Sequence, residues 1–346
     1  MKVYKEATIL DIARELNVSK STVSRALKNH HSIGEATKKA VLDLAKKYNY
    51  HPNNIAYSLS KKSTKTIGVI VPMVSHYYFS TVISGIEELA YKAGYKVIIC
   101  QSGESYKREV LVSQALLSNK VDGLIVSISR ETSDSSHFKV YKDKNVPIVF
   151  FDRVCPDLEA SSVTVDDYQG AYTAVEHLIK SGYRKIAHFA GPPLLQITQK
   201  RIEGYKDALL NNGLPFDQSL VIDCGEGLEQ ENGAEAAQKM LDAGIRPDAV
   251  FAICDPIAIG VMMTLKKNKI KVPDEVAVVG FCDEPVAKVI EPQLSTLVQP
   301  AFDIGGLTVE LLLNQIKSQA PLVEKRVLTA ELKVRGSSVK EAFAVQ

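Results

Sequence analysis

Short apolar runs alternate with amphipathic stretches of helical period over most of this chain. A first series of runs ends at Val165, and a second series follows with the same rhythm. The runs are Ile67–Val71, Lys96–Cys100, Gly123–Ser127, Pro147–Asp152, Val163–Val165, Lys185–Ala190, Leu220–Asp223, Ala249–Cys254 and Val276–Phe281. Such alternation predicts an α/β fold in which helices cover both faces of parallel sheets. Two successive series of such strands and helices predict two Rossmann-like lobes.

The two-lobed body also predicts where a ligand would bind. Ligands of open parallel sheets lie beyond the carboxyl ends of the strands, which places a site in the cleft between the lobes. Hinge closure is the natural response to a ligand there. A late strand over Thr296–Gln299 and a helix over Ala301–Ile316 fit a crossover back to the first lobe.

The first fifty residues are organised differently, as three short helices. Thr8 precedes an apolar stripe of helical spacing, and Asp11 completes a variant of the capping box. Ser19 caps a second helix, and Gly34 precedes a third. Two short helices joined by about three residues predict a helix-turn-helix.

The second helix has a polar and basic outer face. Its outward positions are Lys20, Ser21, Ser24, Arg25 and Lys28. A recognition helix presents its N-terminal residues to base edges, and Arg25 can bind guanine O6 and N7. Short hydroxyls at Ser19, Thr22 and Ser24 suit phosphate contacts. The alternative, for any isolated basic helix, is an ordinary solvated face.

Charge favours the nucleic-acid interpretation of this head. Residues 1–65 hold 13 Lys/Arg and 5 Asp/Glu, a net charge of +8, whereas the remaining residues hold 29 Lys/Arg and 35 Asp/Glu, a net charge of −6. The whole-chain charge of +2 therefore hides a basic head on an acidic body. This asymmetry indicates contact with nucleic acid and predicts an affinity that falls steeply with salt.

Pro52 opens a segment with a small apolar face formed by Ile55, Ala56 and Leu59. A helix of about two turns is marginal alone in water, so we expect this hinge to be helical only when something packs against it. Two copies in a dimer, lying in a minor groove, would supply that partner, and Leu59 would wedge between base steps. A linker with incidental apolar residues is the alternative.

These segments resemble the head of the lactose-repressor (LacI/GalR) family. The similarity runs over Ala7–Ala13 and Val18–Leu27, and continues through Tyr48–Asn53 and Ile55–Leu59. It implies a dimeric transcriptional regulator that binds a palindromic operator in double-stranded DNA.

The resemblance also implies roles for single residues in the head. Lys20, Ser21 and Arg25 take base-reading positions, and Leu59 takes the position of an intercalating leucine. The candidate DNA-binding residues are Thr8, Ser19, Lys20, Ser21, Thr22, Ser24, Arg25, Lys28, Tyr50, Asn53, Ala56 and Leu59.

The body resembles a periplasmic sugar-binding protein, as the core of this family does. The implied parts are a helix-turn-helix DNA-binding domain (6–52), a hinge helix with its linker (53–65), and an effector-binding and dimerisation domain (66–346). Within the last, lobe 1 covers about 66–165 and 296–326, and lobe 2 covers about 166–295 and 327–346.

Candidate effector-binding residues follow strands or begin helices at the edge of the cleft. They are His76, Tyr78, Phe79, Asp152, Arg153, Arg201, Asp255 and Asp283. By the resemblance, Asp152 matches a ligand-contacting aspartate and Arg201 an arginine that contacts effector. Phe79 can equally belong to the lobe core, and each isolated Asp can equally cap a helix.

Four positions depart from the pocket that is usual in the family. They are Ile197, Leu228, Cys254 and Cys282. Polar or aromatic side chains are usual there, so fewer hydrogen bonds to ligand hydroxyls are available. The effector is therefore either a sugar or an anionic sugar derivative held by Arg201 and Arg153.

The composition argues against several other classes of protein. The chain has no apolar run of about 18 residues, no apolar signal-peptide core, no P-loop and no complete Gly-x-Gly-x-x-Gly after a strand. Its histidines lack metal-ligand spacing, and its five cysteines lack metal or redox spacing. We expect a cytoplasmic protein that is not an enzyme, has no cofactor and does not enter a membrane.

The expected function is an effector-controlled repressor of carbohydrate-related genes that acts as a homodimer. A helix containing Val82, Ile86 and Leu89 is a candidate dimer contact, with intramolecular core as the equal alternative. Other possibilities are an activator, a regulator controlled by a partner protein, or a ligand-binding protein or enzyme with an incidental head.

Overall fold

A computed structural model describes residues 7–50, 63–155, 157–318 and 322–340. The chain divides into two compact units between Thr64 and Lys65. The hinge segment predicted over 53–65 lies almost wholly outside the described residues, as do its candidates Asn53, Ala56 and Leu59.

The first unit is a three-helix head, as the capping pattern predicts. Its helices are α1 (Ile9–Glu15), α2 (Lys20–Leu27) and α3 (Glu35–Lys47). The Thr8 backbone N–H donates to the Asp11 carboxylate at 2.8 Å, which completes the predicted capping box at the start of α1. One apolar side chain from each helix, namely Ile12, Val23 and Val41, is completely buried in the shared core.

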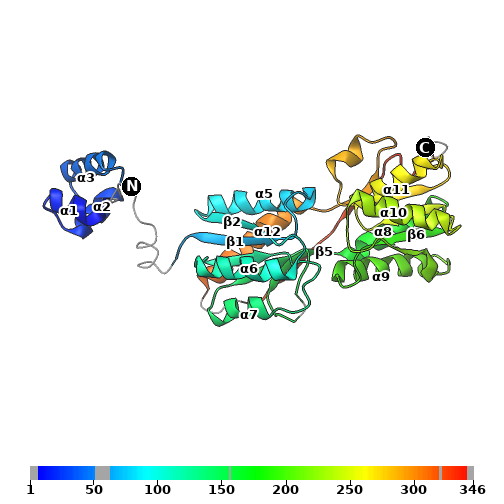
Figure 1. Cartoon of the computed structure of the whole chain (residues 1–346), viewed down its shortest axis with the longest axis horizontal. Coiled ribbons are helices and arrows are strands. Elements are labelled where there is room, and N and C mark those ends of the chain that lie inside the picture. The colour runs from blue at the N-terminus through cyan, green and yellow to red at the C-terminus, as the bar shows by residue number, and fades with distance from the viewer. Residues whose placement is uncertain (1–6, 51–62, 156, 319–321, 341–346) are drawn as a thin grey trace, which may run out of the picture. The chain divides into compact units, whose positions relative to one another are not determined.

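The body begins with a six-stranded parallel sheet (Figure 1). Its strands are β1 (Thr66–Val71), β2 (Lys96–Gln101), β3 (Gly123–Val126), β4 (Ile148–Phe151), β5 (Ser161–Val165) and β11 (Lys325–Leu328), in the order β11-β5-β4-β3-β1-β2. Its helices are α5 (Tyr77–Lys92), α6 (Tyr106–Ser118), α7 (Ser136–Asp143) and α12 (Ala301–Lys317). Alternate strand residues face opposite layers: Val149 and Phe151 contact the core under α5 and α12, whereas Ile148 and Phe150 contact the core under α6 and α7.

Helices α5 and α12 lie in close contact across this lobe. A Cβ on Gly85 of α5 would collide with the backbone carbonyl of Phe302 in α12, so glycine allows the approach. Val82 and Ile86 are completely buried in the same layer, and Leu89 packs against it. Val82 and Ile86 therefore form intramolecular core, whereas a dimer contact by other residues of this helix stays a prediction.

The second sheet also has six strands, of which only β12 is antiparallel. Its strands are β6 (Ile186–Ala190), β7 (Val221–Asp223), β8 (Ala249–Ala252), β9 (Ala277–Phe281), β10 (Ser295–Val298) and β12 (Glu331–Lys333), in the order β12-β10-β9-β8-β6-β7. Its layers contain α8 (Asp167–Lys180), α9 (Gln196–Asn211), α10 (Gln230–Asp242) and α11 (Asp255–Lys267). Helices α8 and α9 contact the core on one face of the sheet, and α10 and α11 the core on the other. The predicted class, a helical head followed by two parallel α/β lobes, is confirmed.

The chain crosses between the lobes three times, and one crossing differs from the prediction. Strand β10 was assigned to the first lobe, but it pairs with β9 and β12 in the second sheet. The reason is a specific side-chain contact, because the Thr296 hydroxyl donates to the Asp255 carboxylate at 2.6 Å. The return to the first lobe therefore comes after Val298. Strand β11, up to Leu328, then pairs with β5 in the first sheet.

No helix in the described part of the chain is long and apolar enough to cross a bilayer.

Candidate functional site

The outer face of α2 is the candidate surface for nucleic acid. The Ser19 hydroxyl accepts a hydrogen bond from the Thr22 backbone N–H at 3.0 Å and fixes the start of the helix. Lys20, Ser21 and Arg25 are exposed on the following turns, away from the buried Val23. No carboxylate of the described residues lies within ion-pair distance of Lys20 or Arg25. These cations are therefore available for phosphate or base contacts.

Other head candidates also have structural contacts of their own. The Thr8 hydroxyl contacts the Asp11 carboxylate at 2.6 Å, and the hydroxyls of Ser21 and Thr22 lie 2.7 and 2.8 Å from that of Ser19. Tyr50 packs against the core of the head. Ser24 is half-buried and Lys28 is exposed, both on the same helix face. A phosphate contact by these groups remains a prediction.

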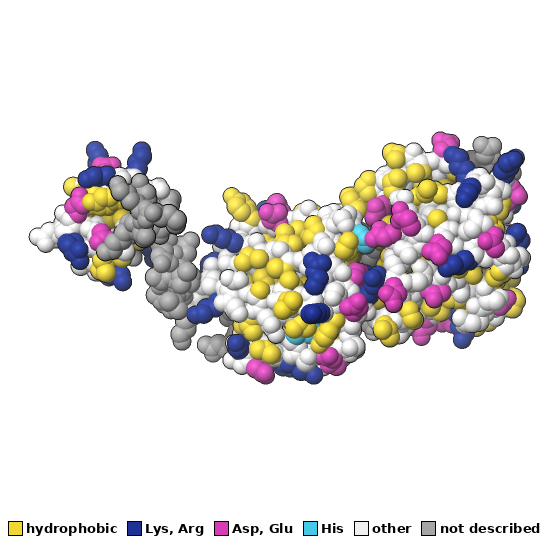
Figure 2. Space-filling view, viewed as in Figure 1, with side chains coloured by type: hydrophobic (Ala, Val, Ile, Leu, Met, Phe, Trp, Pro, Cys, Tyr) yellow, Lys and Arg dark blue, Asp and Glu magenta, His cyan; other side chains and the backbone are white. Residues whose placement is uncertain are grey.

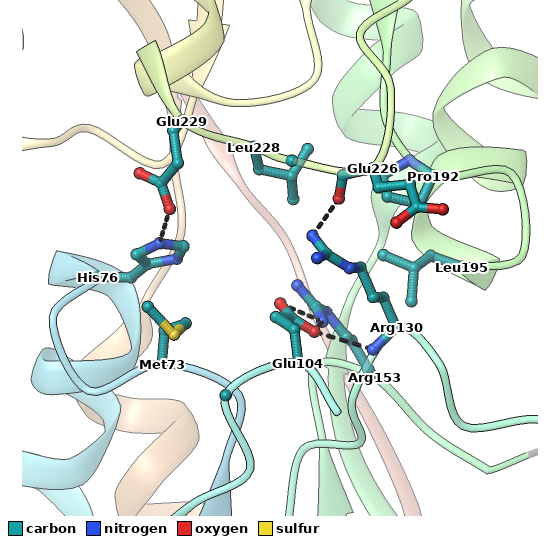
Figure 3. Close-up of a pocket in the computed structure, with 12 residues that line it drawn as sticks. Met73, His76, Glu104, Arg130, Arg153, Pro192, Leu195, Glu226, Leu228 and Glu229 are labelled. Carbon is teal, nitrogen blue, oxygen red and sulfur yellow. Dashed lines mark hydrogen bonds and ion pairs between the residues drawn. The ribbon is translucent and has the colours of Figure 1, made fainter. Parts of the chain in front are cut away.

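The second candidate site is a pocket of about 270 Å³ in the body (Figure 3). First-lobe residues of its lining follow β1, β2, β3 and β4, and second-lobe residues follow β6 and β7, so the carboxyl ends of both sheets contribute. The lining residues are Met73, His76, Gly103, Glu104, Arg130, Arg153, Pro192, Leu195, Glu226, Gly227, Leu228 and Glu229. Of the predicted effector residues, His76 and Arg153 line this pocket.

Two buried arginines near the cleft are already neutralised by carboxylates of their own lobes. Arg153 donates to both oxygens of Glu104 at 2.9 Å (Figure 3). Arg201, which is 3% exposed, donates to Asp167 at 2.7 and 2.9 Å and also to the Ile253 carbonyl. Burial lowers the pKa of Arg201, but the combined effect of Asp167, Cys282 and Asp152 exceeds it and the pKa is raised overall. Neither guanidinium is a free positive charge.

Asp152 lies beside these pairs in a strained position. Its φ of 59° is in the left-handed region, which Asp tolerates better than most residues, and it turns the chain at the end of β4. Burial raises the pKa of Asp152 to about 6, although Arg153 opposes the shift. Tyr78 lies close enough for Asp152 to affect its pKa, which burial raises well above the usual range. The Tyr78 hydroxyl makes no hydrogen bond of ordinary geometry among the described residues, but it lies near enough to Asp152 to lower the pKa of that carboxyl.

Two of the predicted effector residues, Phe79 and Asp255, make structural contacts of their own. Phe79 packs edge-on against Phe151 in the first-lobe core. Asp255 accepts hydrogen bonds from the Thr296 hydroxyl at 2.6 Å and the Glu284 backbone N–H at 2.8 Å, and burial raises its pKa to about 7. These contacts hold the turn after β9.

Asp283 is paired with Arg335 at 2.6 Å and with Lys288 at 3.0 Å. Like Asp255, it is not part of the pocket lining. The cleft-facing role predicted for both carboxylates stays a prediction.

Several lining residues are absent from the candidates predicted from the sequence, above all Glu104, Arg130, Glu226 and Glu229. Each follows a strand at its carboxyl end, which is the same rule that pointed to Asp152 and Arg153. Applied to every strand, this rule also identifies these four charged residues. The pairing of Glu104 with Arg153 has no sequence signal, because 49 positions separate them.

A helix-turn-helix head joined to a two-lobed body with a cleft defines a class of ligand-responsive DNA-binding regulators. Two family models match the chain accordingly. Residues 8–53 match the model described as bacterial regulatory proteins, lacI family, and residues 64–332 match that of periplasmic binding proteins and sugar binding domain of LacI family. The chain belongs to the LacI family.

Named relatives and a solved structure are similar to this chain over nearly its whole length. Catabolite control protein A of Priestia megaterium is 33% identical over 90% of this chain and 93% of its own. The HTH-type transcriptional repressor CytR of Escherichia coli is 31% identical over 98% of this chain and 99% of its own length. A crystal structure of the lac repressor dimer bound to operator and the anti-inducer ONPF is 26% identical, with a TM-score of 0.84 over 97% of this chain and 100% of that one. The predicted function, an effector-controlled DNA-binding transcriptional regulator, is confirmed at the level of the family.

Proposed function

We propose that this protein is a homodimeric repressor that binds a palindromic operator and is controlled by a small, neutral, polar effector in the cleft of the body. DNA binding supports a cytoplasmic location. The relatives support the repressor role, and the lac repressor dimer on its operator supports the dimeric, palindromic mode.

Sequence recognition is assigned to the exposed start of α2. The helix is capped by Ser19, and Lys20, Ser21 and Arg25 project from its first two turns. Arg25 has no ion pair among the described residues, so its planar guanidinium is available for a bidentate contact with guanine. The hydroxyls around Ser19 position the helix on phosphates.

The proposal of a neutral effector rests on the ion pairs in the cleft. Arg153 is paired with Glu104, and Arg201 is paired with Asp167. The charged side chains that line the pocket are Arg130, Arg153, Glu104, Glu226 and Glu229, so carboxylates outnumber cations by one. To bind Arg153 or Arg201, a phosphate or carboxylate would have to break a buried pair, and it would meet excess negative charge in the pocket lining.

Hydrogen-bonding capacity nevertheless remains around the cleft. Buried polar atoms without partners among the described residues include the Tyr78 and Ser127 hydroxyls, the Thr198 hydroxyl and the Gln299 amide oxygen. These groups follow β3 and β10 or belong to the first turns of α5 and α9. A buried polar atom without a partner is costly, so a ligand with several hydroxyl or amide groups gains by pairing with them.

The pocket size fits a small molecule. Ligand pockets typically enclose roughly 300–1,000 Å³, and about 270 Å³ lies just below that range. Apolar contact comes from Met73, Leu195 and Leu228 at the pocket wall. We infer an effector about the size of a monosaccharide or a nucleoside.

The effector acts by its different affinity for two arrangements of the lobes. A ligand can shift such an equilibrium only by this difference, so contacts from both lobes to one molecule favour closure. The change at the first lobe then alters whether two heads in a dimer can hold one operator.

Thermal unfolding of the full chain tests the effector class. Neutral pentoses, hexoses and nucleosides are compared with their phosphate esters at matched concentrations, because a bound ligand stabilises by mass action. We expect a neutral compound to raise the unfolding midpoint and its phosphate ester to have no effect. Stabilisation by phosphate esters alone would contradict the neutral assignment.

A further inference from the structure

One contact across the mouth of the cleft joins the first residues of two helices. His76 is the N-cap of α5 in the first lobe, and Glu229 is the N-cap of α10 in the second. The His76 Nε2 lies 2.9 Å from the Glu229 Oε1 (Figure 3). The carboxylate is therefore placed near the positive ends of both helix dipoles, which favours negative charge there.

A second cross-lobe contact lies on another side of the same pocket. The Arg130 guanidinium donates to the backbone carbonyl of Glu226 (Figure 3). The Arg130 backbone N–H donates to Glu104 at 2.8 Å, so the strand-end loop that carries Arg130 is tied to the pocket floor.

A buried carboxylate holds this loop from below. Glu109 of α6 is completely buried and accepts hydrogen bonds from the Ser129 backbone N–H at 2.6 Å and the Thr132 hydroxyl at 2.7 Å. His137 Nε2 lies 2.9 Å from the same carboxylate. Arg130 is thus presented to the second lobe by a pre-formed loop, which lowers the entropy cost of its contact.

We propose that His76, Arg130, Glu226 and Glu229 form a latch that holds the two lobes closed and controls access to the pocket. All four residues line the pocket, and the two contacts stand at opposite sides of it in Figure 3. Both are made by protein groups alone, so the latch does not depend on which effector binds. Charged side chains of both signs gather where the two lobes meet on the face shown in Figure 2.

The neighbouring charges fit a latch of moderate strength. Glu284, after β9, also faces this point: burial raises its pKa, His76 lowers it and Glu229 raises it. Two carboxylates thus compete for one histidine, which limits the strength of closure. The Glu229 side chain is 53% exposed, so the contact resembles a surface ion pair, and its loss changes the open population by about two- to fivefold. Loss of both contacts multiplies these factors to about four- to twenty-five-fold.

Native cysteines report opening of the cleft without an added probe. Cys282 is half-buried at the second-lobe side of the cleft. Gln299 donates to its sulfur at 3.3 Å, and the thiol is near enough to Tyr78 of the first lobe to affect the pKa of that hydroxyl. Cys155 and Cys224 are buried within the first and the second lobe respectively, and report local or global unfolding. Opening of the cleft exposes more of the half-buried Cys282, so its labelling rate increases with the population of the open state.

The test is labelling of the full-length protein by N-ethylmaleimide, with each cysteine quantified by peptide mass spectrometry. The double variant His76→Ala/Arg130→Ala is compared with Lys200→Ala/Glu235→Gln, which breaks the exposed pairs Lys200–Glu203 and Glu235–Lys239 within single helices. Circular dichroism and the rates at Cys155 and Cys224 establish that each variant is folded.

We expect Cys282 labelling to accelerate about four- to twenty-five-fold in the latch variant and to stay at the wild-type rate in the control. Rates at Cys155 and Cys224 remain unchanged. Equal Cys282 rates in latch variant and wild type would overturn the latch, as would acceleration of the same size in the control. Glu229→Gln alone should give an intermediate rate, and an unchanged rate there would remove Glu229 from the latch.

Discussion

Replacing Arg201 by methionine should destabilise the body strongly, because its partner would be left as a buried, uncompensated charge. The guanidinium is 3% exposed, donates twice to Asp167, and lies 3.6 Å above the Phe281 ring centre. Breaking a buried pair of this kind costs roughly 3–5 kcal/mol. We expect a loss of that size in the free energy of unfolding of the body, measured by urea unfolding of the full chain at pH 8.

The same pair predicts a compensating change and a pH dependence. The double variant Arg201→Met/Asp167→Asn removes both charges and should recover more than half of the loss. In the single variant, burial raises the pKa of Asp167 without the opposing effect of Arg201. An acid with a raised pKa in the folded state contributes stability at low pH that is lost as pH rises, so the deficit should be smaller at pH 5 than at pH 8.

A double-mutant cycle decides whether this reasoning holds. A loss below about 1 kcal/mol in Arg201→Met, or equal losses in the single and double variants, would mean that Asp167 does not need the arginine. The cation would then be available to an anionic effector, and the proposal of a neutral one would lose its main support.

Three further predictions concern the head and the second lobe. Ser19→Ala removes the side-chain acceptor of the Thr22 N–H and should cost the head about 1 kcal/mol, seen as a lower unfolding midpoint of the head transition; an unchanged midpoint would show that the cap is redundant. Arg25→Ala should relax preference at one base pair by about 1–3 kcal/mol in binding to systematically substituted operators, whereas a uniform loss across sequences would make Arg25 a phosphate contact. The pKa of Asp255 is raised by burial to about 7, so its contribution to stability is present below about pH 4 and lost as pH rises through 7. Asp255→Asn should therefore gain stability relative to wild type between pH 5 and pH 8, by up to about 4 kcal/mol, and parallel stability curves would contradict this.

Much of the fold follows from local sequence pattern. The predicted strand Lys185–Ala190 is observed as Ile186–Ala190, and Val276–Phe281 as Ala277–Phe281, because continuous apolar runs of this length are buried on both faces. The capping residues Thr8 and Ser19 likewise locate the starts of α1 and α2. Local patterns suffice where the determining interactions are themselves local.

Assignments that depend on distant partners could not be made in this way. The run Ser295–Val298 is equally suitable for either sheet, and its place is decided by pairing with β9 and by the contact of Thr296 with Asp255. The face of α5 that contains Val82 and Ile86 has the pattern of an interface as much as of a core. Only the approach of α12 decides between them.

The same limit applies to the cleft. Sequence position pointed to Arg153 and Arg201 as cations facing the effector, but their charge is cancelled by Glu104 and Asp167, which are 49 and 34 residues away. Because ion pairing depends on the folded geometry, the residue types alone left neutral and anionic effectors equally open.

We infer that a neutral ligand of the cleft controls the affinity of the head for DNA. Its most direct test is fluorescence anisotropy of the full-length protein on a palindromic operator selected from random duplexes, with each neutral sugar or nucleoside measured beside its own phosphate ester at constant salt. We expect that one neutral compound changes operator affinity at least about tenfold, a coupling of about 1.4 kcal/mol, while its phosphate ester does not. A change produced by the phosphate esters and by no neutral compound would contradict it.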